Sequence, residues 1–197
     1  MKILKKYHEP FISEAYYHIF NRSINKEKLF LNENNYGYFL NQWNKYIDPY
    51  LSVLSYCLLP NHYHFFVQVR ATEVDNINGL LEEKFKRFLS SYTLAYNKQN
   101  KRTGSLFQKS FKRIEVREDY HFTKLLHYIH HNPVHHGLVK HYSNWKFSSF
   151  TAVISNKPTQ IDRKMVLEWF GGKENFIEFH SENLNYNKIE RLIKHDI

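Results

Sequence analysis

Residues 51–69 read LSVLSYCLLPNHYHFFVQV, two strand-like runs separated by Pro60 and Asn61. Both separating residues form turns, so the stretch predicts a β-hairpin with antiparallel strands. Side chains alternate between the two faces of a strand, so His62 and His64 point to one face and Tyr63 to the other. The hairpin therefore presents two neighbouring imidazoles on one face of a sheet.

This pair of imidazoles allows two interpretations. Neutral imidazole binds divalent cations such as Zn²⁺ and Mn²⁺, but two ligands are too few for tight binding, so a third group is needed. In the other interpretation, one histidine lies at the edge of the core and the other is solvated. The spacing of His62 and His64 alone favours this second interpretation.

Outward from the hairpin, apolar residues recur with the periods of strands and helices. The expected strands lie at 15–20 and 114–116, and the expected helices at 33–47, 80–96, 119–132 and 163–170. The helix from 119 should end near Asn132, because a residue before proline is biased away from helical angles. Helices that alternate with strands joined by short turns predict an α+β fold, an antiparallel sheet covered by helices.

The expected helix at 119–132 contains a tyrosine that could serve as a nucleophile. Tyr128 and Asn132 are four residues apart and share a helix face. The phenol has an ordinary pKa near 10, so it needs a metal, a base or a cationic environment to react. The alternatives are a half-buried structural tyrosine, and an Asn132 that caps a new short helix beginning at Pro133. This helix alone identifies no activity.

Composition limits the class of protein. The 197 residues suit one domain, or one domain with an appendage. A formal charge of +9 favours a polyanionic partner, with nucleic acid ahead of an anionic membrane surface, although it could serve solubility alone. The single cysteine excludes a disulfide or a cysteine zinc site within one chain. No signal peptide or membrane span is evident, so we expect a soluble cytoplasmic protein.

Most of the net positive charge lies between residues 84 and 124. This segment holds eleven lysines or arginines against three carboxylates, with aromatic residues interleaved. Basic side chains contact phosphates, and exposed aromatic rings stack on unpaired bases. For Phe85, Phe88 and Tyr92, a core stripe on a helix with a solvated basic face is the preferred interpretation. In the loop expected at 97–113, the residues considered for nucleic-acid contact are Arg102, Gln108, Lys112 and Arg113.

Three segments together resemble the REP-associated tyrosine transposases, within the HUH superfamily of single-strand DNA transposases. They are LLPNHYHFFVQ at 58–68, RTGSLFQKSFK at 102–112 and YIHHNPVHHGLV at 128–139. Further similar segments are HIFNRSINKEKLF at 18–30, WKFSSF at 145–150 and VLEWFGGKENFIEF at 166–179. The resemblance spans roughly residues 10–180, and the three central motifs in this order are specific together.

The resemblance implies a fold and a division of the chain. The fold is a ferredoxin-like antiparallel sheet flanked by helices. Residues 1–150 would form the catalytic domain, and 151–197 a helical extension that packs on it. Relatives of this kind act as monomers or homodimers in the bacterial cytoplasm, and both oligomeric states stay open here.

The resemblance also implies a chemistry. Tyr128 would attack single-stranded DNA next to a hairpin, giving a 5′-phosphotyrosine and a free 3′-hydroxyl. His62 and His64 would bind a divalent metal, with Asn132 as third ligand. Mg²⁺ or Mn²⁺ suits this set, and two nitrogen ligands favour Mn²⁺. His131 is a candidate base for the phenol proton.

The implied DNA contacts include Arg22 and a departure from the family pattern. Relatives often have Arg-Ala where this chain has His135 and His136, so His135 is a candidate DNA contact whose charge changes near neutral pH. Two other functions remain open. One is a nuclease that uses a metal-bound water and does not need Tyr128. The other is a hairpin-binding protein without catalysis.

Overall fold

The chain folds around a four-stranded sheet in a computed structural model that describes residues 7–117, 119–182 and 184. In chain order the elements are β1 (Tyr16–Arg22), η2 (Ile24–Lys26), α1 (Glu33–Tyr46), β2 (Leu51–Leu59), β3 (His62–Val69), α2 (Ile77–Gln99), β4 (Lys112–Glu115), α3 (Asp119–His135), η3 (Tyr142–Asn144), α4 (Phe150–Ile154), α5 (Arg163–Trp169) and α6 (Lys173–Ser181). Within the described residues, no helix is long and apolar enough to cross a membrane.

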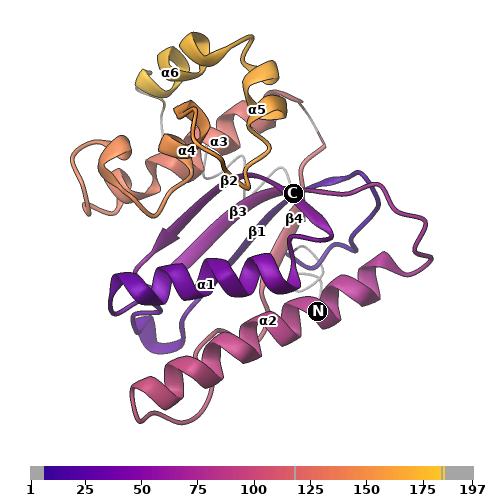
Figure 1. The fold of residues 1–197 in the computed structure, drawn as a ribbon, viewed down its shortest axis with the longest axis vertical. Coiled ribbons are helices and arrows are strands. Elements are labelled where there is room, and N and C mark those ends of the chain that lie inside the picture. Colours follow the sequence, from indigo (N-terminus) through magenta and orange to yellow (C-terminus); the bar gives the residue numbers. More distant parts are fainter. Residues whose placement is uncertain (1–6, 118, 183, 185–197) are drawn as a thin grey trace.

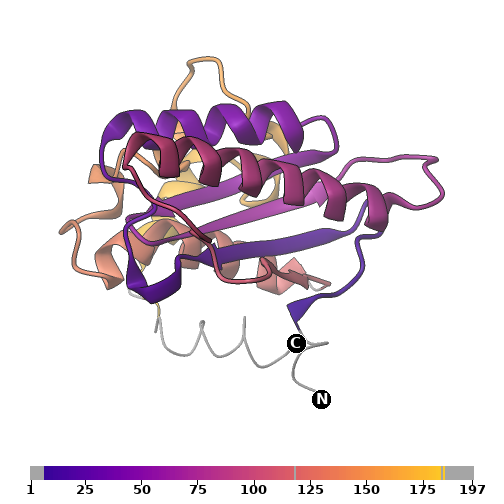
Figure 2. The same cartoon turned by 90° about the horizontal axis from the view of Figure 1, so that it is seen from below.

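The strands lie in the order β2-β3-β1-β4, and every neighbouring pair is antiparallel. This order, with α1 after β1 and α2 after β3, is the ferredoxin-like β-α-β-β-α-β arrangement. The predicted fold class is therefore confirmed. In Figure 1, α1 and α2 lie on one side of the sheet, and α3 with α4, α5 and α6 lies on the other. Figure 2 shows α1 and α2 running beside each other over their face.

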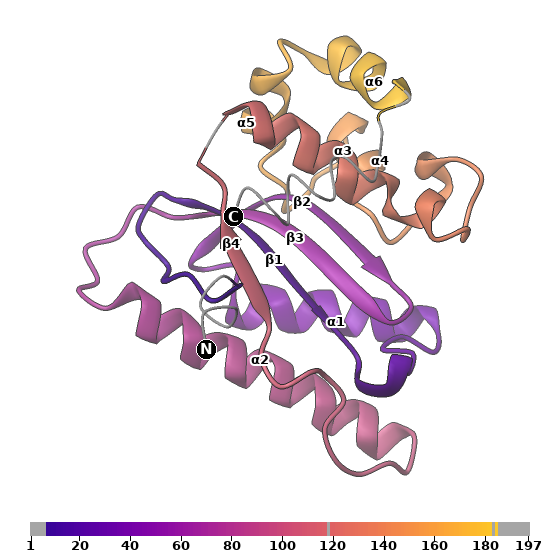
Figure 3. The ribbon, with the colours of Figure 1, turned by 180° about the vertical axis from the view of Figure 1, so that it is seen from behind.

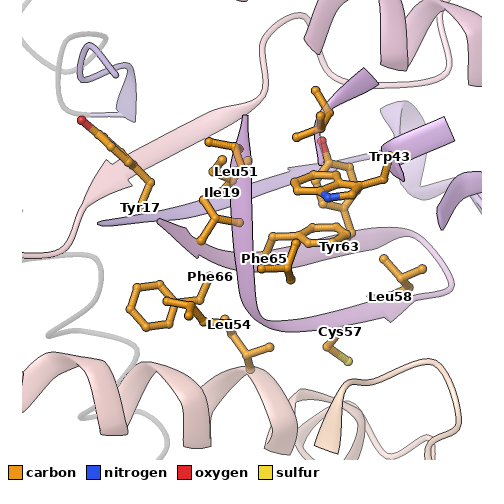
Figure 4. Packing of buried hydrophobic residues seen from close by; sticks show 14 of the residues in the cluster. Tyr17, Ile19, Trp43, Leu51, Leu54, Cys57, Leu58, Tyr63, Phe65 and Phe66 are labelled. Carbon is orange, nitrogen blue, oxygen red and sulfur yellow. The ribbon is translucent and has the colours of Figure 1, made fainter. Parts of the chain in front are cut away.

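Successive side chains of β3 point to opposite faces of the sheet. On the face toward α1, the ring of Phe65 stacks on Trp43 with centroids 3.7 Å apart. Tyr63, on the same face, has its ring 5.2 Å from Phe39. Phe66 belongs to the opposite face and packs against Phe122 of α3 at 5.5 Å. Figure 4 shows Tyr63 and Phe65 beside Trp43, with Phe66 directed away from them. His62 and His64 therefore face α3.

The helix α3 is longer than expected, so the predicted end near Asn132 is wrong. Pro133 lies inside the helix, which continues to His135. Its end is set by Gly137, which has a φ of 67°. Gly137 N donates to Val134 O at 2.9 Å and Leu138 N donates to Pro133 O at 2.9 Å, the Schellman pattern of a helix end. Proline removes one hydrogen bond here, whereas the glycine cap satisfies two terminal carbonyls.

Other elements also differ from expectation, among them α2, which spans Ile77–Gln99 instead of 80–96. β4 begins at Lys112, inside the segment expected to be a loop, because it pairs with β1 over Tyr17–Phe20. Beyond α5, which ends before Gly171 as expected, the chain forms α6, a further helix that the periodicity did not indicate. The final part of the expected C-terminal extension, 185–197, lies outside the described residues.

Candidate active site

A cavity of about 350 Å³ opens between β1, β3 and α3. The strand register explains which strand residues line this cavity, because residues directly opposite each other in a sheet share a face. On β1, Phe20 lies opposite His64 and Arg22 lies opposite His62. On the other side of β1, Phe20 lies opposite Lys112. The full lining is Phe20, Asn21, Arg22, His62, Tyr63, His64, Gln108, Lys112, Tyr128, Asn132 and His136.

Tyr128 and Asn132 reach this cavity from one face of α3, as their spacing predicts. Tyr128 is 3% exposed, and its ring meets the His64 ring edge-on with centroids 5.6 Å apart. Asn132 is fully buried and donates from Nδ2 to Tyr128 O at 2.7 Å. This hydrogen bond fixes the amide and assigns Oδ1 as the end that could bind a cation.

The two histidines of β3 are both held at Nδ1. His62 Nδ1 lies 2.6 Å from Asn61 Oδ1, and His64 Nδ1 lies 2.9 Å from Nε2 of His18 on β1. All three histidines are buried. Metal-binding histidines characteristically use their second ring nitrogen for such an outer contact, which sets the tautomer and the ring orientation. With Nδ1 engaged, Nε2 is the atom of each ring suited to a cation.

The side chains that could bind a divalent cation such as Mg²⁺ or Mn²⁺ are the imidazoles of His62 and His64 and the amide of Asn132, which would supply the third ligand. Within the described part of the chain, no group of three or more His, Cys, Asp or Glu side chains is arranged for a metal ion. The set of two imidazoles and one amide oxygen leaves several positions of an octahedral ion for other oxygen ligands. Phosphate oxygens of a bound strand are of that type.

Three of the five expected DNA contacts line the cavity. These are Arg22, Gln108 and Lys112, which share the lining with the two histidines of β3. Gln108 is held by its backbone, because its N–H donates to Arg22 O at 2.9 Å. Lys112 Nζ lies 5.8 Å from the centroid of the Phe20 ring. Two cationic side chains and an amide therefore line the same cavity as Tyr128, and groups of this kind can bind a phosphodiester.

Arg113 and Arg102 lie elsewhere and make structural contacts. Strand alternation turns Arg113 to the α2 side, where it is 3% exposed and donates from Nη2 to Glu82 Oε1 at 2.6 Å. Arg102 pairs with Glu27, Nε to Oε2, at 3.0 Å, and donates from Nη2 to Ser105 O at 2.8 Å. Arg102 therefore holds the loop that leads to Gln108.

His131 and His135 are likewise outside the lining of the cavity. His131 faces α6, where its Nε2 lies 2.9 Å from His180 O. His135 is exposed, and it is the next residue, His136, that lines the cavity. The His136 ring lies 4.8 Å from that of His62.

Sequence reasoning missed three residues of this site: His18, Asn61 and His136. Asn61 was identified only as a turn former, although it directly precedes His62 in the hairpin. His136 directly follows the last residue of α3, and its N–H still donates to Asn132 O at 3.0 Å, so helical spacing from Asn132 extends to it. The role of His18 depends on the pairing of β1 with β3, and no local pattern in the sequence indicates that register.

The opposite face of α3 is joined to α6 by buried histidines. His130 lies between His180 and Ser149, with Nδ1 2.9 Å from His180 Nε2 and Nε2 2.8 Å from Ser149 Oγ. Burial, followed by the nearby imidazoles, lowers the pKa of His180 to about 3 and that of His127 to about 4. These imidazoles are neutral near pH 7, so α3 is backed by an uncharged hydrogen-bonded network.

Comparison with known proteins places this geometry in context. A protein of Haemophilus influenzae with the provisional name REP-associated tyrosine transposase is 33% identical over 99 residues, which are 48% of this chain. The chain is therefore similar in sequence to that protein. The match spans 56% of the length of the Haemophilus protein. No family model matches the chain.

A solved structure supports the same relationship at the level of the fold. It is described as a REP-associated tyrosine transposase bound to a REP hairpin, and it superposes with a TM-score of 0.60 over 77% of this chain and 87% of its own. At 19% identity this likeness establishes the shared fold. The sequence comparison agrees with the resemblance inferred from the three motifs, and the structural comparison agrees with the fold that this resemblance implies.

Proposed function

We propose that the chain is a metal-dependent single-strand DNA transposase or nickase that cleaves next to DNA hairpins. The observation that supports this most is the common cavity of Tyr128, His62, His64 and Asn132. A nucleophile candidate from one helix meets two imidazoles from a strand that is far away in sequence. The hairpin as partner follows from the solved structure of similar fold, which is described as bound to one.

In the proposed reaction, the phenol oxygen of Tyr128 forms a bond to the phosphorus of the scissile phosphodiester and the phenol loses its proton. The bond from phosphorus to the 3′ oxygen breaks, and that oxygen takes up a proton and leaves as a hydroxyl. The product is a 5′-phosphotyrosine, which preserves the energy of the phosphodiester. A 3′-hydroxyl can therefore attack it later and rejoin two strands without ATP.

The other residues of the cavity have distinct proposed roles. A divalent cation held by His62, His64 and Asn132 would polarise the scissile phosphate and offset its growing charge. Arg22 and Lys112 neutralise neighbouring phosphates, and Gln108 donates from its amide. His18 and Asn61 orient the two imidazoles. We assign no role as base to His131, because its ring faces α6.

The C-terminal helices are proposed to support the catalytic helix rather than to form an independent unit. His130 and His131 of α3 both contact His180 of α6. The proposed catalytic domain, 1–150, therefore depends on the extension from 151 for the position of α3. Removing α6 would expose these imidazoles.

A covalent adduct assay tests the proposal. The protein is incubated with single-stranded DNA that contains a hairpin and flanking sequence, plus Mn²⁺, and run on a denaturing protein gel. We expect a DNA adduct with the wild type and none with Tyr128→Phe or with EDTA. Cleaved DNA without an adduct would instead indicate a nuclease using water, and tight binding without cleavage would indicate a hairpin-binding protein.

A further inference from the structure

A second concavity, larger in volume than the cavity at Tyr128, lies between α2 and the segment 104–111. We call it the α2 groove, and its volume is about 1180 Å³. After α2 ends, the chain turns at Gly104, whose φ is 86°, and returns alongside the helix to β4. Figure 3 shows this segment running back along α2 toward the edge of the sheet.

The α2 groove is lined by side chains suited to a phosphate backbone. Apart from Glu82, its exposed polar residues offer ammonium, hydroxyl or amide donors, namely Lys86, Ser90, Ser105, Gln108, Lys109 and Ser110. Glu82 is the one carboxylate among the described lining residues, and it is paired with Arg113 at 2.6 Å. The groove therefore has a net positive charge from Lys86 and Lys109. Such donors contact phosphates and sugars and carry no information on base sequence.

The groove also contains apolar surface, part of which is continuous with the core. Leu94 of α2 is 71% exposed at its rim, and Leu89 and the half-buried Phe111 contribute further apolar lining. Apolar side chains beside phosphate donors suit the sugars and base faces of an unpaired strand.

The α2 groove adjoins the proposed active site at Gln108, which lines both concavities. Lys112 and Arg113, the first two residues of β4, line different concavities. Strand alternation directs Lys112 to the cavity and Arg113 to the α2 groove. A strand that leaves the cavity past Gln108 therefore enters a groove of matching charge.

We propose that the α2 groove binds the single-stranded DNA that flanks the cleavage point, through its backbone and without sequence preference. This inference rests on the proposed function, since it extends the path of the same substrate. It adds a binding surface on the α2 side of the molecule, away from the tyrosine and the imidazoles.

Binding of two DNAs to two double variants tests the α2 groove. One DNA is a hairpin with about ten unpaired nucleotides on each side, and the other is the hairpin alone. The groove variant is Lys86→Ala with Lys109→Ala. The control, with the same loss of charge, is Lys157→Ala with Lys164→Ala, at exposed positions outside the groove lining. All are made in a Tyr128→Phe background, so that no cleavage occurs.

For the flanked DNA we expect the groove variant to raise Kd about tenfold and to reduce the slope of log K against log salt by about 1.4, for two lost phosphate contacts. For the hairpin alone, and for the control variant, we expect changes of less than about twofold. Equal losses of affinity for both DNAs, or a loss no greater than that of the control variant, would overturn the proposed role of the α2 groove. Failure of the protein with intact lysines to bind any hairpin DNA would overturn the proposed function as well.

Discussion

At the scale of single residues, the proposed site is defined by what holds each imidazole. His64 is fixed through Nδ1 by His18, and His62 through Nδ1 by Asn61. A ring fixed in this way presents Nε2 without losing rotamer freedom on binding, which favours metal affinity. Two strands and a turn therefore cooperate to present two nitrogen atoms.

We predict that His18→Phe weakens Mn²⁺ binding about tenfold, because the phenyl ring fills the space but cannot bond to His64. His18→Gln should recover part of the affinity, since its amide can again contact Nδ1. Titration of Mn²⁺ followed by electron paramagnetic resonance measures this without DNA or cleavage. Wild-type affinity in His18→Phe would show that His18 has no positioning role.

At the scale of elements, α3 carries residues of the proposed active site and also the histidines that contact α6. One face presents Tyr128 and Asn132 to the cavity, and the other presents His127, His130 and His131 to α6. The helix crosses Pro133 and ends in a glycine cap. Its position depends on neutral imidazoles on one side and on that cap at its end.

The end of α3 gives a prediction with a matched control. A side chain added at Gly137 meets no atom within 4 Å, so its cost comes from the φ of 67° alone. We expect Gly137→Ala to lower the free energy of unfolding by about 1 kcal/mol. Gly37→Ala, in the middle of α1 and equally open, should raise it by about 0.5–1 kcal/mol. Urea unfolding measures both, and effects of the same sign would contradict the backbone argument.

The histidines between α3 and α6 predict a loss of stability in mild acid. Burial holds the pKa of His180 to about 3 and that of His127 to about 4, whereas an unfolded histidine titrates near 6.5. As the pH falls from about 6.5 toward 4, the unfolded chain binds protons that the folded chain refuses. The free energy of unfolding should therefore fall by up to about 1.4 kcal/mol per pH unit for each such histidine.

Urea unfolding at pH 7.5, 6.5 and 5.5 measures this dependence above the range in which carboxylates titrate. His180→Gln removes one of the imidazoles and should make the decline shallower, whatever its effect on stability at pH 7.5. A stability that does not change between pH 7.5 and 5.5 would contradict the neutral network.

At the scale of the whole molecule, the features set by local sequence patterns were predicted, whereas those set by the pairing of distant strands were not. The hairpin, the shared face of His62 and His64, and the shared face of Tyr128 and Asn132 follow from periods of two and of about four residues. The separation of Lys112 from Arg113 does not, because it requires the pairing of β4 with β1. His18 was missed for the same reason, since its contact with His64 crosses 46 residues of sequence.

The residue that carries the DNA adduct decides whether Tyr128 is the nucleophile. Trypsin releases residues 125–140 as one peptide, in which Tyr128 is the one residue with a hydroxyl side chain. The protein is first reacted with a hairpin-bearing single strand, and the bound DNA is then digested with a nuclease. Mass spectrometry should find on this peptide a nucleotide attached through its 5′ phosphate, and fragmentation should locate it at Tyr128. An adduct on any other peptide, or cleaved DNA with this peptide unmodified, would contradict the assignment of Tyr128 as the nucleophile.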